Sequence, residues 1–389
     1  MLLEGLKVVE MSTWVAGPGC AGVMADWGAD VIKVESPMGD VTRSFFINPA
    51  DGQSPIFANE NRGKKSVVLD TTKATGRAAL KMLLADADIF VTNTRPGSLK
   101  KIGLDYDSLK ADFPRLIYAA VTGYGLTGPY ADVAAFDITA FWTRSGVARA
   151  MIPTDQEPFP SRPGFGDHMT AINTVAAILA AVHERHSTGK GRLVETSLIR
   201  AGAYAIGWDL SVQLRYGEVA TAQPRNDRPQ GISGFFRTKD DRYFCIVPRT
   251  VQCFTNVMIA VDRPEAVADP RFEPPVTDLE LTREIRAMCD AGFGALTLDE
   301  VGVRLDSLDV AWAPMATLKE LSESDMAEIA GCFVTVADGA GGTYRLPAAP
   351  ARFPEGAPEV RKAPPLLGQH TREVLEAAGL TEAEIAAVL

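Results

Sequence analysis

The chain has 389 residues, of which 46% are hydrophobic and 23% are charged, and its formal net charge at pH 7 is -10. This composition provides enough apolar material for a sizeable core and excludes an intrinsically disordered protein. The length predicts two domains. The acidic total disfavours a nucleic-acid partner, because such proteins present a basic face to the phosphates.

The cysteines and the first residues indicate the compartment. The cysteines number five and no two show a CxxC spacing, which argues against a disulfide framework or a zinc site and for reduced thiols in the cytoplasm. The opening MLLEGLKVVE lacks the basic and then long apolar pattern of a secretory signal. The longest mostly apolar stretch, 171–182, is too short to span a bilayer and predicts a buried helix. We therefore expect a cytoplasmic protein with no membrane partner.

The first two hundred residues alternate between short apolar runs and segments with helical apolar spacing. Strands are predicted at 6–11, 30–35, 66–70, 88–92 and 116–122, and helices in the segment that ends at residue 27 and at 75–84. Strands separated by helical segments are typical of βαβ units, which build a parallel sheet. The sequence therefore predicts an α/β domain.

A loop rich in small residues is predicted at 14–22, between the first strand and the first helix. Its run Ala16-Gly17-Pro18-Gly19 lies at a strand end, where doubly wound folds bind ligands. The run is not a GxGxxG fingerprint, although Glu35 ends the next strand, and this argues against a nicotinamide site. A tight turn that requires small residues explains the run at least as well.

A long helix is predicted at 167–187, with Asp167 as its N-cap and Gly189 as its stop. Apolar residues on nearly all of its faces predict that it is buried. The dipole and free amides of the helix N-terminus are expected to keep an aspartate there ionised.

The sequence pattern changes after Gly217. Residues 223–234 predict a linker, 235–247 a hairpin, and 252–289, 298–308 and 318–321 short helices. Residues 347–365, rich in Pro and Ala, are expected to wrap back over the first domain before two helical segments in 371–389. We therefore predict a large domain at 1–222, a smaller α+β domain at 223–325, and a return segment at 326–389 that completes the large domain.

Two basic clusters follow or precede predicted strands. One is Asn61-Arg62-Gly63-Lys64-Lys65, and the other is Arg95-Pro96-Gly97 with Lys100 and Lys101. Cations at strand ends can hold phosphates through charge-assisted hydrogen bonds. A solvated surface is the simpler explanation for either cluster taken alone.

Asp167 follows a glycine-rich approach, Arg162-Pro-Gly-Phe-Gly, that lets a ligand come close to the backbone. An ionised carboxylate there can act as a nucleophile toward an acyl carbon. Local chemistry alone favours an ordinary helix cap, because N-cap aspartates are common. The sequence contains neither an HExxH nor a GxSxG motif, which argues against zinc and serine hydrolases.

Taken in order, these runs resemble the family III CoA-transferases, a family that also contains the α-methylacyl-CoA racemases. The matching runs are LLEGLKVVEMSTWVAGPGCAGVMADWGADVIKVE, NRGKKSVVLD, ADIFVTNTRPG, LIYAAVTGYGLTGPY, GFGDHMT and ILAAVHERHSTGKG. The resemblance implies a Rossmann-like large domain completed by the chain end, a small domain, and an interlocked, ring-like homodimer.

The resemblance also implies a groove for coenzyme A, as part of an acyl-CoA substrate, and no permanently bound cofactor or metal. The residues implied are Arg62, Lys64 and Lys65 near the nucleotide phosphates, Asn93, Arg95, Pro96 and Gly97 with Lys101 along the groove, and Val15, Ala16 and Gly17 near the thioester. Ser36 stands where many members carry an arginine for the nucleotide end, and Lys33 or Arg43 are the candidates to replace it.

Two departures separate the branches of the family. Racemases use a His and an Asp as paired acid and base, and their histidine falls at Phe136, which cannot transfer a proton. His168-Met169-Thr170 replaces their glycine run after Asp167, and the spacing to ILAA matches the transferases. The segment 230–234 is poorer in glycine than the flap of oxalate-type members, which disfavours a formyl-CoA:oxalate enzyme.

The resemblance therefore implies a CoA-transferase that moves CoA from an acyl-CoA donor to a small carboxylic acid. Asp167 would be the nucleophile and would carry an aspartyl-CoA thioester, in transfer between two acids or within one diacid. Trp14, Phe136 and His168 are the expected substrate contacts, and Arg162 or His168 would orient the acceptor. Aromatic residues there indicate an apolar pocket, although aromatics are more often plain core.

Two other functions stay open. A 2-methylacyl-CoA racemase would need His168 or Asp137 as a replacement proton carrier. A catalytically silent acyl-CoA-binding protein is compatible with Phe136, Ser36 and the glycine-poor segment.

Overall fold

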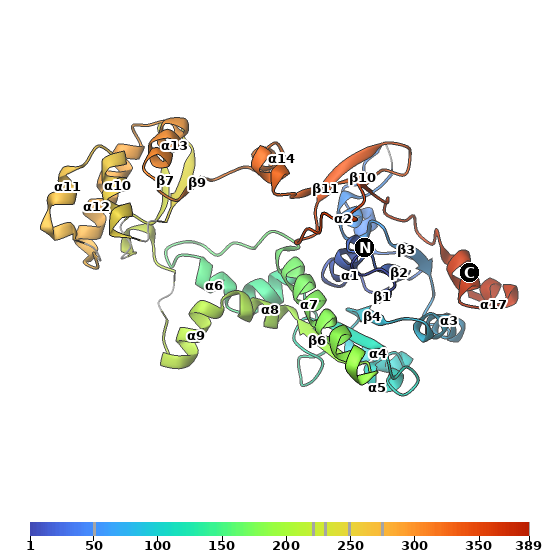
Figure 1. The fold of residues 1–389 in the computed structure, drawn as a ribbon. Coiled ribbons are helices and arrows are strands. Elements are labelled where there is room, and N and C mark those ends of the chain that lie inside the picture. The colour runs from blue at the N-terminus through green and yellow to red at the C-terminus, as the bar shows by residue number, and fades with distance from the viewer. Residues whose placement is uncertain (50–51, 220–221, 229–231, 248–249, 274–275, 389) are drawn as a thin grey trace. The chain divides into compact units, whose positions relative to one another are not determined.

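The computed structural model describes residues 1–49, 52–219, 222–228, 232–247, 250–273 and 276–388. The chain divides into two compact units (Figure 1). Unit 1 comprises Met1–Met151, Pro158–Val219 and Glu328–Leu389, and unit 2 comprises Ile152–Glu157 and Ala220–Ala327. The C-terminal segment thus groups with the N-terminal part of the chain.

Unit 1 is built on a six-stranded parallel sheet in the order β3-β2-β1-β4-β5-β6. The strands are β1 Lys7–Met11, β2 Asp30–Glu35, β3 Lys65–Val68, β4 Ile89–Thr92, β5 Ile117–Thr122 and β6 Leu193–Ser197. The first five confirm the predicted strands and the α/β class. The pattern did not indicate β6, because its sequence LVETS is half polar.

Both faces of the sheet are covered, as a parallel sheet requires. Alternate residues of each strand point to opposite faces. Val9 packs in a core with α3 (Ala74–Ala85), α16 (Thr371–Ala377) and α17 (Glu382–Val388), whereas Val8 packs in a core with α1 (Ala16–Asp26) and α7 (Phe165–Thr188). The return segment therefore completes one of the two layers.

The expected loop at 14–22 is wrong, because α1 already begins at Ala16. The small residues serve close packing within a helix. A Cβ at Gly17 would lie 2.6 Å from Ser12 Cβ, and one at Gly22 would lie 2.5 Å from the Glu60 carbonyl oxygen. A larger residue at either position would push α1 away from its neighbours.

The remaining elements of unit 1 lie around the sheet. The helices are η1 Val41–Ser44, α2 Pro55–Asn61, α4 Pro96–Ile102, α5 Tyr106–Leu109, η2 Ile138–Arg144, α6 Val147–Met151, α8 Leu198–Ala205 and α9 Gly207–Tyr216. A small sheet in the order β11-β10-β12 is formed by β10 Phe333–Ala337, β11 Thr343–Pro347 and β12 Val360–Arg361.

Unit 2 combines an antiparallel sheet with short helices. Its strands, in the order β7-β8-β9, are β7 Gly234–Arg237, β8 Tyr243–Ile246 and β9 Trp312–Pro314. Its helices are η3 Arg225–Asp227, α10 Val251–Ala260, α11 Glu265–Ala268, η4 Pro270–Phe272, α12 Leu279–Phe293, α13 Leu298–Ser307 and α14 Leu318–Ser322, and α15 Asp325–Ile329 follows. The predicted hairpin is confirmed. Of the segment 230–234, Gln230 and Gly231 lie outside the described residues.

One described helix, α7, is long and apolar enough to cross a membrane by length and composition alone. It has 24 residues, twice the apolar stretch read from the sequence. It packs on α1 and β5, and Ala171, Val175 and Ile178 belong to the core of unit 1. This packing is that of a core helix.

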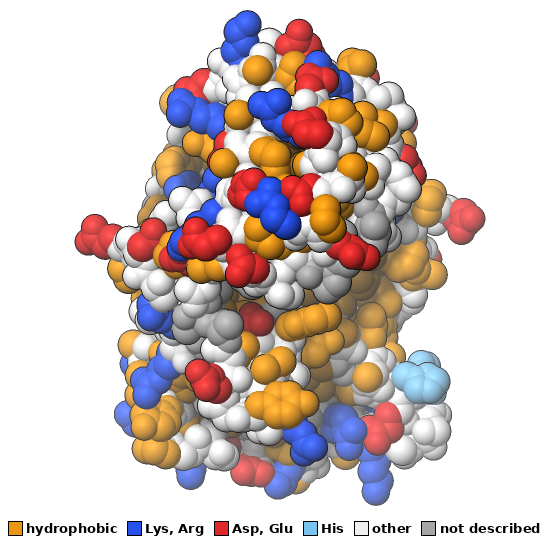
Figure 2. Space-filling view, turned by 90° about the vertical axis from the view of Figure 1, so that its left-hand side faces the viewer, with side chains coloured by type: hydrophobic (Ala, Val, Ile, Leu, Met, Phe, Trp, Pro, Cys, Tyr) orange, Lys and Arg blue, Asp and Glu red, His pale blue; other side chains and the backbone are white. Residues whose placement is uncertain are grey.

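Charged side chains of both signs share the surface drawn in Figure 2. Lys and Arg side chains are interspersed there with Asp and Glu. On the described residues of that face, the cations therefore do not form a continuous basic patch of the kind that binds nucleic acid.

Candidate active site

The carboxyl ends of β1 and β4 mark the point where the strand order of the sheet reverses. Doubly wound folds bind ligands in the crevice at such a point. The Asn93 side chain joins the two loops there. Its Oδ1 accepts a hydrogen bond from the Thr13 amide at 3.0 Å, and its Nδ2 donates to the Thr13 carbonyl at 2.7 Å. This reciprocal pair fixes one loop against the other.

A cavity of about 490 Å³ opens beside these loops. It is lined by the segments that follow β1, β4 and β5 and by the starts of α7 and α8. The sequence-predicted site residues that line it are Trp14, Ala16, Asn93, Arg95, Pro96, Phe136 and Asp167. Residues from four separate stretches of the sequence thus meet in one cavity.

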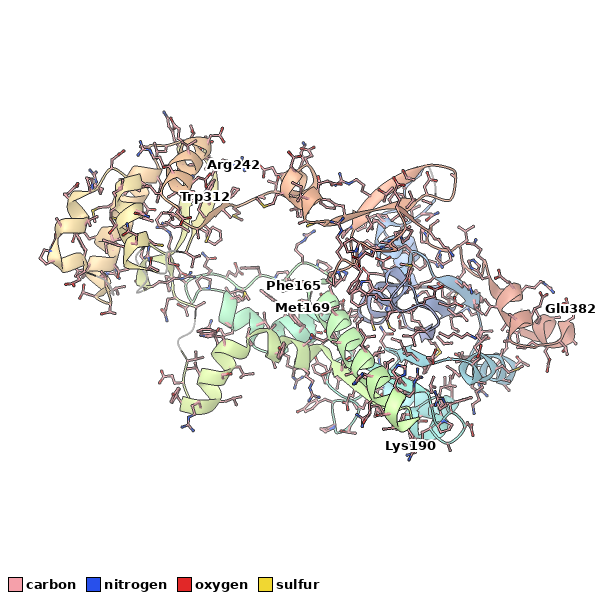
Figure 3. All side chains as sticks on the ribbon, viewed as in Figure 1. Phe165, Met169, Lys190, Arg242, Trp312 and Glu382 are labelled. Atoms are coloured by element: carbon pink, nitrogen blue, oxygen red, sulfur yellow. The ribbon has the colours of Figure 1, made fainter. Side chains whose placement is uncertain are left out.

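Asp167 lies in the first turn of α7, whose N-terminal end carries Phe165 and Met169 in Figure 3. The prediction that Asp167 is the N-cap is wrong. The helix begins two residues earlier, with Gly164 as its N-cap at φ 85°. Glycine adopts this left-handed conformation without steric cost. The predicted stop at Gly189 is confirmed, since it is the C-cap at φ 69°.

Gly166 lets the start of α7 pack against an aromatic ring. A Cβ at this position would lie 2.4 Å from Cγ of the buried Phe141. We expect Gly166→Ala to lower the free energy of unfolding by about 1–3 kcal/mol, since the methyl group overpacks a closed site. Urea unfolding measures this, and Gly207→Ala is the control, because a Cβ there meets nothing within 4 Å. Equal midpoints for the two variants would contradict the expectation.

The Asp167 carboxyl is only partly ionised at neutral pH. Burial, assisted by the charge of Asp137 and more weakly by that of Glu60, raises its pKa to about 7, while His168 opposes the rise. The expectation that the helix N-terminus holds Asp167 ionised is therefore wrong, since the partial positive charge of the helix is outweighed. Asp137 itself is buried, and its Oδ1 accepts from the Ile138 amide at 2.7 Å.

His168 is not among the residues that line the cavity, and its Nε2 faces α2. Its Nε2 lies 2.9 Å from Oε1 of the buried Glu60, and its side chain is 53% exposed. This hydrogen bond raises the pKa of His168, as do the charges of Glu60, Asp167 and Asp137. Sequence reasoning missed Glu60, because it lies in no recognisable motif.

Two aromatic side chains, Trp14 and Phe136, line the cavity, and Phe45 lies beside Trp14. The Trp14 ring contacts Phe136 edge-on, with centroids 5.2 Å apart, and lies 5.8 Å from Phe45. Trp14 adopts φ 68°, which is rare for a bulky residue and is typical of functional sites. Sequence reasoning identified Trp14 and Phe136 but not Phe45.

The cations of the first basic cluster are not brought together. Each pairs with a different carboxylate: Arg62 with Asp26 at 2.6 Å, Lys64 with Glu10 at 2.7 Å, and Lys65 with Asp30 at 3.0 Å. Arg62 and Lys64 are 5% and 3% exposed. Their charges are thus satisfied inside the fold, and their contact with phosphates stays a prediction.

Both candidates to replace the arginine missing at Ser36 are already paired with carboxylates. Lys33 is fully buried and contacts Glu10 and Asp40. The Arg43 guanidinium is held by both carboxylate oxygens of Glu35.

Four other predicted groove residues do not line the cavity. Val15 is the N-cap of α1, and Gly17 lies in its first turn against Ser12. The Gly97 amide donates to Asp132 Oδ1 at 2.8 Å, and Lys101 is exposed in the last turn of α4. All four flank segments that do line it.

A buried charge cluster, comprising Glu10, Lys33, Lys64, Asp40 and Ser12, supports the loop after β1. Glu10 Oε1 lies 2.9 Å from Lys33 Nζ, and its Oε2 lies 2.7 Å from Lys64 Nζ. Ser12 Oγ donates to Glu10, and Lys33 donates to the Ser12 carbonyl. Burial alone would raise the pKa of Glu10, but the two lysines outweigh it and lower the pKa to about 2.

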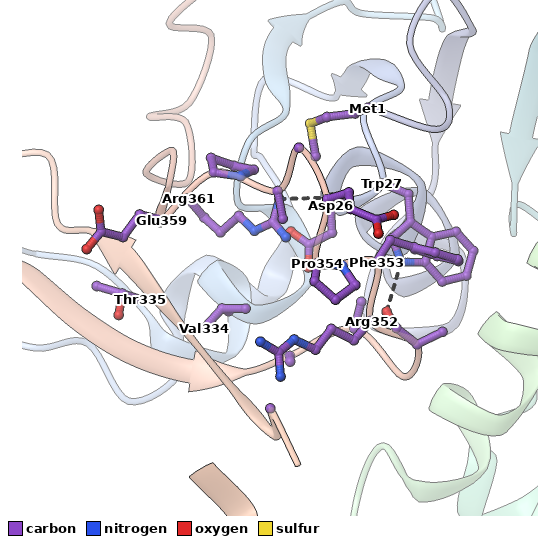
Figure 4. Close-up of a pocket in the computed structure, with 18 of the residues that line it drawn as sticks. Met1, Asp26, Trp27, Val334, Thr335, Arg352, Phe353, Pro354, Glu359 and Arg361 are labelled. Atoms are coloured by element: carbon purple, nitrogen blue, oxygen red, sulfur yellow. Dashed lines mark hydrogen bonds between the residues drawn. The ribbon is translucent and has the colours of Figure 1, made fainter. Parts of the chain in front are cut away.

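A second cavity, of about 360 Å³, lies against β10 in unit 1 (Figure 4). Arg361 donates there to the Asp26 carbonyl at 3.0 Å, and Trp27 donates to the Ala351 carbonyl at 3.3 Å. None of the site residues predicted from the sequence, all of which the structure describes, lines this cavity. The described residues also contain no group of three or more His, Cys, Asp or Glu that could hold a metal ion.

Known proteins with similar sequences are CoA-transferases. The (R)-2-hydroxy-4-methylpentanoate CoA-transferase of Clostridioides difficile is 32% identical over 99% of this chain and 97% of its own length. The cinnamoyl-CoA:phenyllactate CoA-transferase of Clostridium sporogenes is 32% identical over 99% of this chain and 95% of its own length.

The fold and the family agree with these relatives. The crystal structure of a CAIB/BAIF family protein from Brucella suis matches with a TM-score of 0.84 at 29% identity, over 97% of this chain and 99% of that one. Residues 3–371 match the model of CoA-transferase family III. The chain therefore belongs to CoA-transferase family III and is an enzyme of the CoA-transferase type.

Proposed function

We propose that the enzyme moves CoA from an acyl-CoA to a carboxylic acid through an aspartyl-CoA thioester on Asp167. The observation that carries this proposal is the position of Asp167, which lines the cavity at the switch point of the sheet together with Asn93 and Arg95. A carboxylate can attack a thioester carbon and form a covalent intermediate.

Each step exchanges one bond to carbon for another. An Asp167 oxygen attacks the thioester carbon, the C–S bond breaks, and CoA leaves as a thiolate with a mixed anhydride left behind. The thiolate attacks the Asp167 carbonyl carbon and releases the donor acid as a carboxylate. The acceptor carboxylate then attacks this thioester, and the freed thiolate takes the new acyl group from the second anhydride and restores Asp167. Two easier exchanges replace one hard exchange.

The surrounding residues suit this sequence of steps. Coenzyme A serves as substrate, and Arg95 is exposed at the edge of the cavity, where it can pair with an anionic part of the substrate. The His168 amide donates to the Gly164 carbonyl at 2.9 Å, so it does not stabilise an oxyanion. Earlier amides in the first turn of α7 have no acceptor within the helix and can serve as donors.

The acid substrates we propose are apolar or aromatic carboxylic acids. Trp14 and Phe136 line the cavity, with Phe45 beside Trp14, and their faces and edges offer apolar contact to an acyl chain. The two relatives are named for a branched-chain 2-hydroxy acid and for phenyllactate and cinnamoyl-CoA. Both the aromatic cluster and the substrates in these names favour an apolar or aromatic acid.

We also propose that two chains form a homodimer. Helices α8 and α9 of unit 1 expose large apolar side chains, with Tyr204, Trp208, Leu214 and Tyr216 between 76% and 87% exposed. Surfaces of this kind are typical of subunit contacts. Analytical ultracentrifugation that finds a monomer at micromolar concentration would contradict the proposal.

The direct test incubates the enzyme with a panel of acyl-CoA donors and free acids. Exchange is followed by chromatography, and the protein is quenched and analysed by peptide mass spectrometry. We expect a CoA-sized adduct on the peptide that contains Asp167 when an aromatic or branched donor is present. Exchange without any adduct on that peptide would refute the covalent route.

The rate of exchange should depend on pH through Asp167. We expect kcat/KM for the acyl-CoA to rise as pH rises through about 7, because only the carboxylate attacks. Below that pH the rate should fall about tenfold per pH unit, while ordinary acid substrates stay ionised. Initial rates between about pH 5 and 9 measure this, with circular dichroism to check folding. A flat profile would contradict it.

A further inference from the structure

Glu60 is a buried carboxylate that α2 holds against both α1 and α7. It is 4% exposed, and its Oε1 accepts from Asn59 Nδ2 at 2.6 Å and contacts His168 Nε2 at 2.9 Å. A Cβ at Gly19 would lie 2.7 Å from Glu60 Oε2, so α1 can approach this carboxylate only because it has glycine there. The packing of three helices thus holds the Glu60 carboxylate against the side chains of Asn59 and His168.

The contacts of His168 fix the orientation of its ring. Glu60 holds Nε2, and the opposite edge, with Cε1 and Nδ1, lies beside Gly164, where a Cβ would be 3.5 and 3.6 Å from these two atoms. The side chain is still 53% exposed, so a ligand can reach it. The ring is therefore oriented by the protein but open to a substrate.

Carboxylates surround this imidazole. Glu60 lies in α2, Asp167 in α7, and Asp137 immediately before η2. The charges of all three raise the pKa of His168 and so favour its protonated ring. The charge of Glu60 also acts on Lys64, where it opposes the lowering of the lysine pKa by burial. The imidazolium in turn favours the ionised form of its neighbour Asp167. A positive charge at this place offsets the burial that disfavours the nucleophilic carboxylate.

We propose that Glu60 is a positioning residue that holds His168 as a cation beside Asp167. The imidazolium favours the ionised form of Asp167, and its Nδ1–H, which has no hydrogen-bond partner among the described residues, can bind the carboxylate of the acceptor acid by a charge-assisted hydrogen bond. This inference rests on the proposed CoA transfer, and it adds Glu60, which no sequence motif marks, as the residue that positions the acceptor contact His168.

The test uses Glu60→Gln, which keeps the shape and removes the charge, and His168→Gln, which alters a half-exposed side chain. In both variants we expect kcat/KM for the acyl-CoA to fall about tenfold at about pH 6, with a smaller loss at about pH 8.5, where Asp167 is ionised without help. In His168→Gln, kcat/KM for the acceptor acid should fall as well, because the cation that binds its carboxylate is lost. The double variant should lose no more than either single variant, because the two residues act as one unit.

A spectroscopic readout separates this role from a structural one. Histidine NMR titration should show a lower pKa for His168 in Glu60→Gln than in the wild-type enzyme. His186→Gln, an exposed change at the other end of α7, is the matched control and should keep the wild-type pH profile.

The two proposals fail in different ways. If the wild-type enzyme exchanges CoA and forms the adduct but both single variants keep its pH profile, this inference is overturned and the proposed function stands. If Glu60→Gln does not fold, His168→Gln decides alone. If the wild-type enzyme forms no adduct on Asp167, the proposed function and this inference fall together.

Discussion

Asp167→Ala is expected to lose CoA exchange by a factor on the order of 10⁴ or more, as removal of a covalent nucleophile does in other enzymes. The carboxylate of Asp167 takes part in both anhydrides and in the aspartyl-CoA thioester, so no step of the proposed route survives without it. The CoA adduct should vanish together with the exchange. Coupled chromatographic assays and peptide mass spectrometry measure the two losses separately.

A neighbouring carboxylate provides the matched control. Asp137→Asn removes a charge that raises the pKa of Asp167, but the amide oxygen can still accept from the Ile138 amide. We expect this variant to keep CoA exchange. At acidic pH it should retain a larger share of its maximal rate than the wild-type enzyme does, because Asp167 then ionises at lower pH. Exchange that survives in Asp167→Ala would end the proposal, whatever the control does.

Glu10→Gln is the second change with a large expected effect, in this case on stability. We expect the free energy of unfolding to fall by about 3–5 kcal/mol, because the variant leaves two lysines buried without their shared carboxylate. Lys64 is the more affected, since Lys33 keeps Asp40 at 3.0 Å. Urea unfolding at neutral pH measures the loss. The loop that carries Ser12 and Trp14 should lose order as well, because Ser12 donates to Glu10.

The pH dependence of this loss has a definite sign. The pKa of Glu10 is about 2 in the fold against an ordinary 4.5, so its contribution is fully present above 4.5 and disappears as pH falls through about 2. The difference between Glu10→Gln and wild type should narrow over that interval. Asp107→Asn, which breaks an exposed pair with Lys110, is the control and should leave the midpoint unchanged. A constant difference down to the lowest pH would contradict the role assigned to Glu10.

The strands and most helices could be predicted because local pattern and tertiary role agree. Runs such as DVIKVE and LIYAAVT are short, β-rich and bounded by polar residues, and both are strands. The first helix was misplaced because small residues are typical of turns, whereas in α1 they serve helix packing against Ser12 and Glu60. Propensity describes the residue alone and not the neighbour that requires it to be small.

The same distinction between local pattern and tertiary contacts applies to the candidate site. Trp14, Asn93, Arg95 and Phe136 were identified from runs that keep family order, and they do line one cavity. The basic stretch that begins at Arg62 stays a predicted phosphate contact, and the structure adds its pairing with carboxylates. Clustered cations near a strand resemble a phosphate site, but two of them are buried against Asp26 and Glu10, which are distant in the sequence. The sequence alone cannot show which of these cations pair with a carboxylate in the folded protein.

The sequence by itself determined the family, the parallel α/β class and the identity of Asp167 as the candidate nucleophile, because these depend on local patterns and their order. Only the tertiary structure decided the charge state of Asp167 and the residues that tune it. Burial and the approach of Glu60, Asp137 and His168 set its pKa near 7, against the effect expected from the helix terminus. These groups come from separate elements of the chain, and ionisation depends on distance and burial in space rather than on position in the sequence.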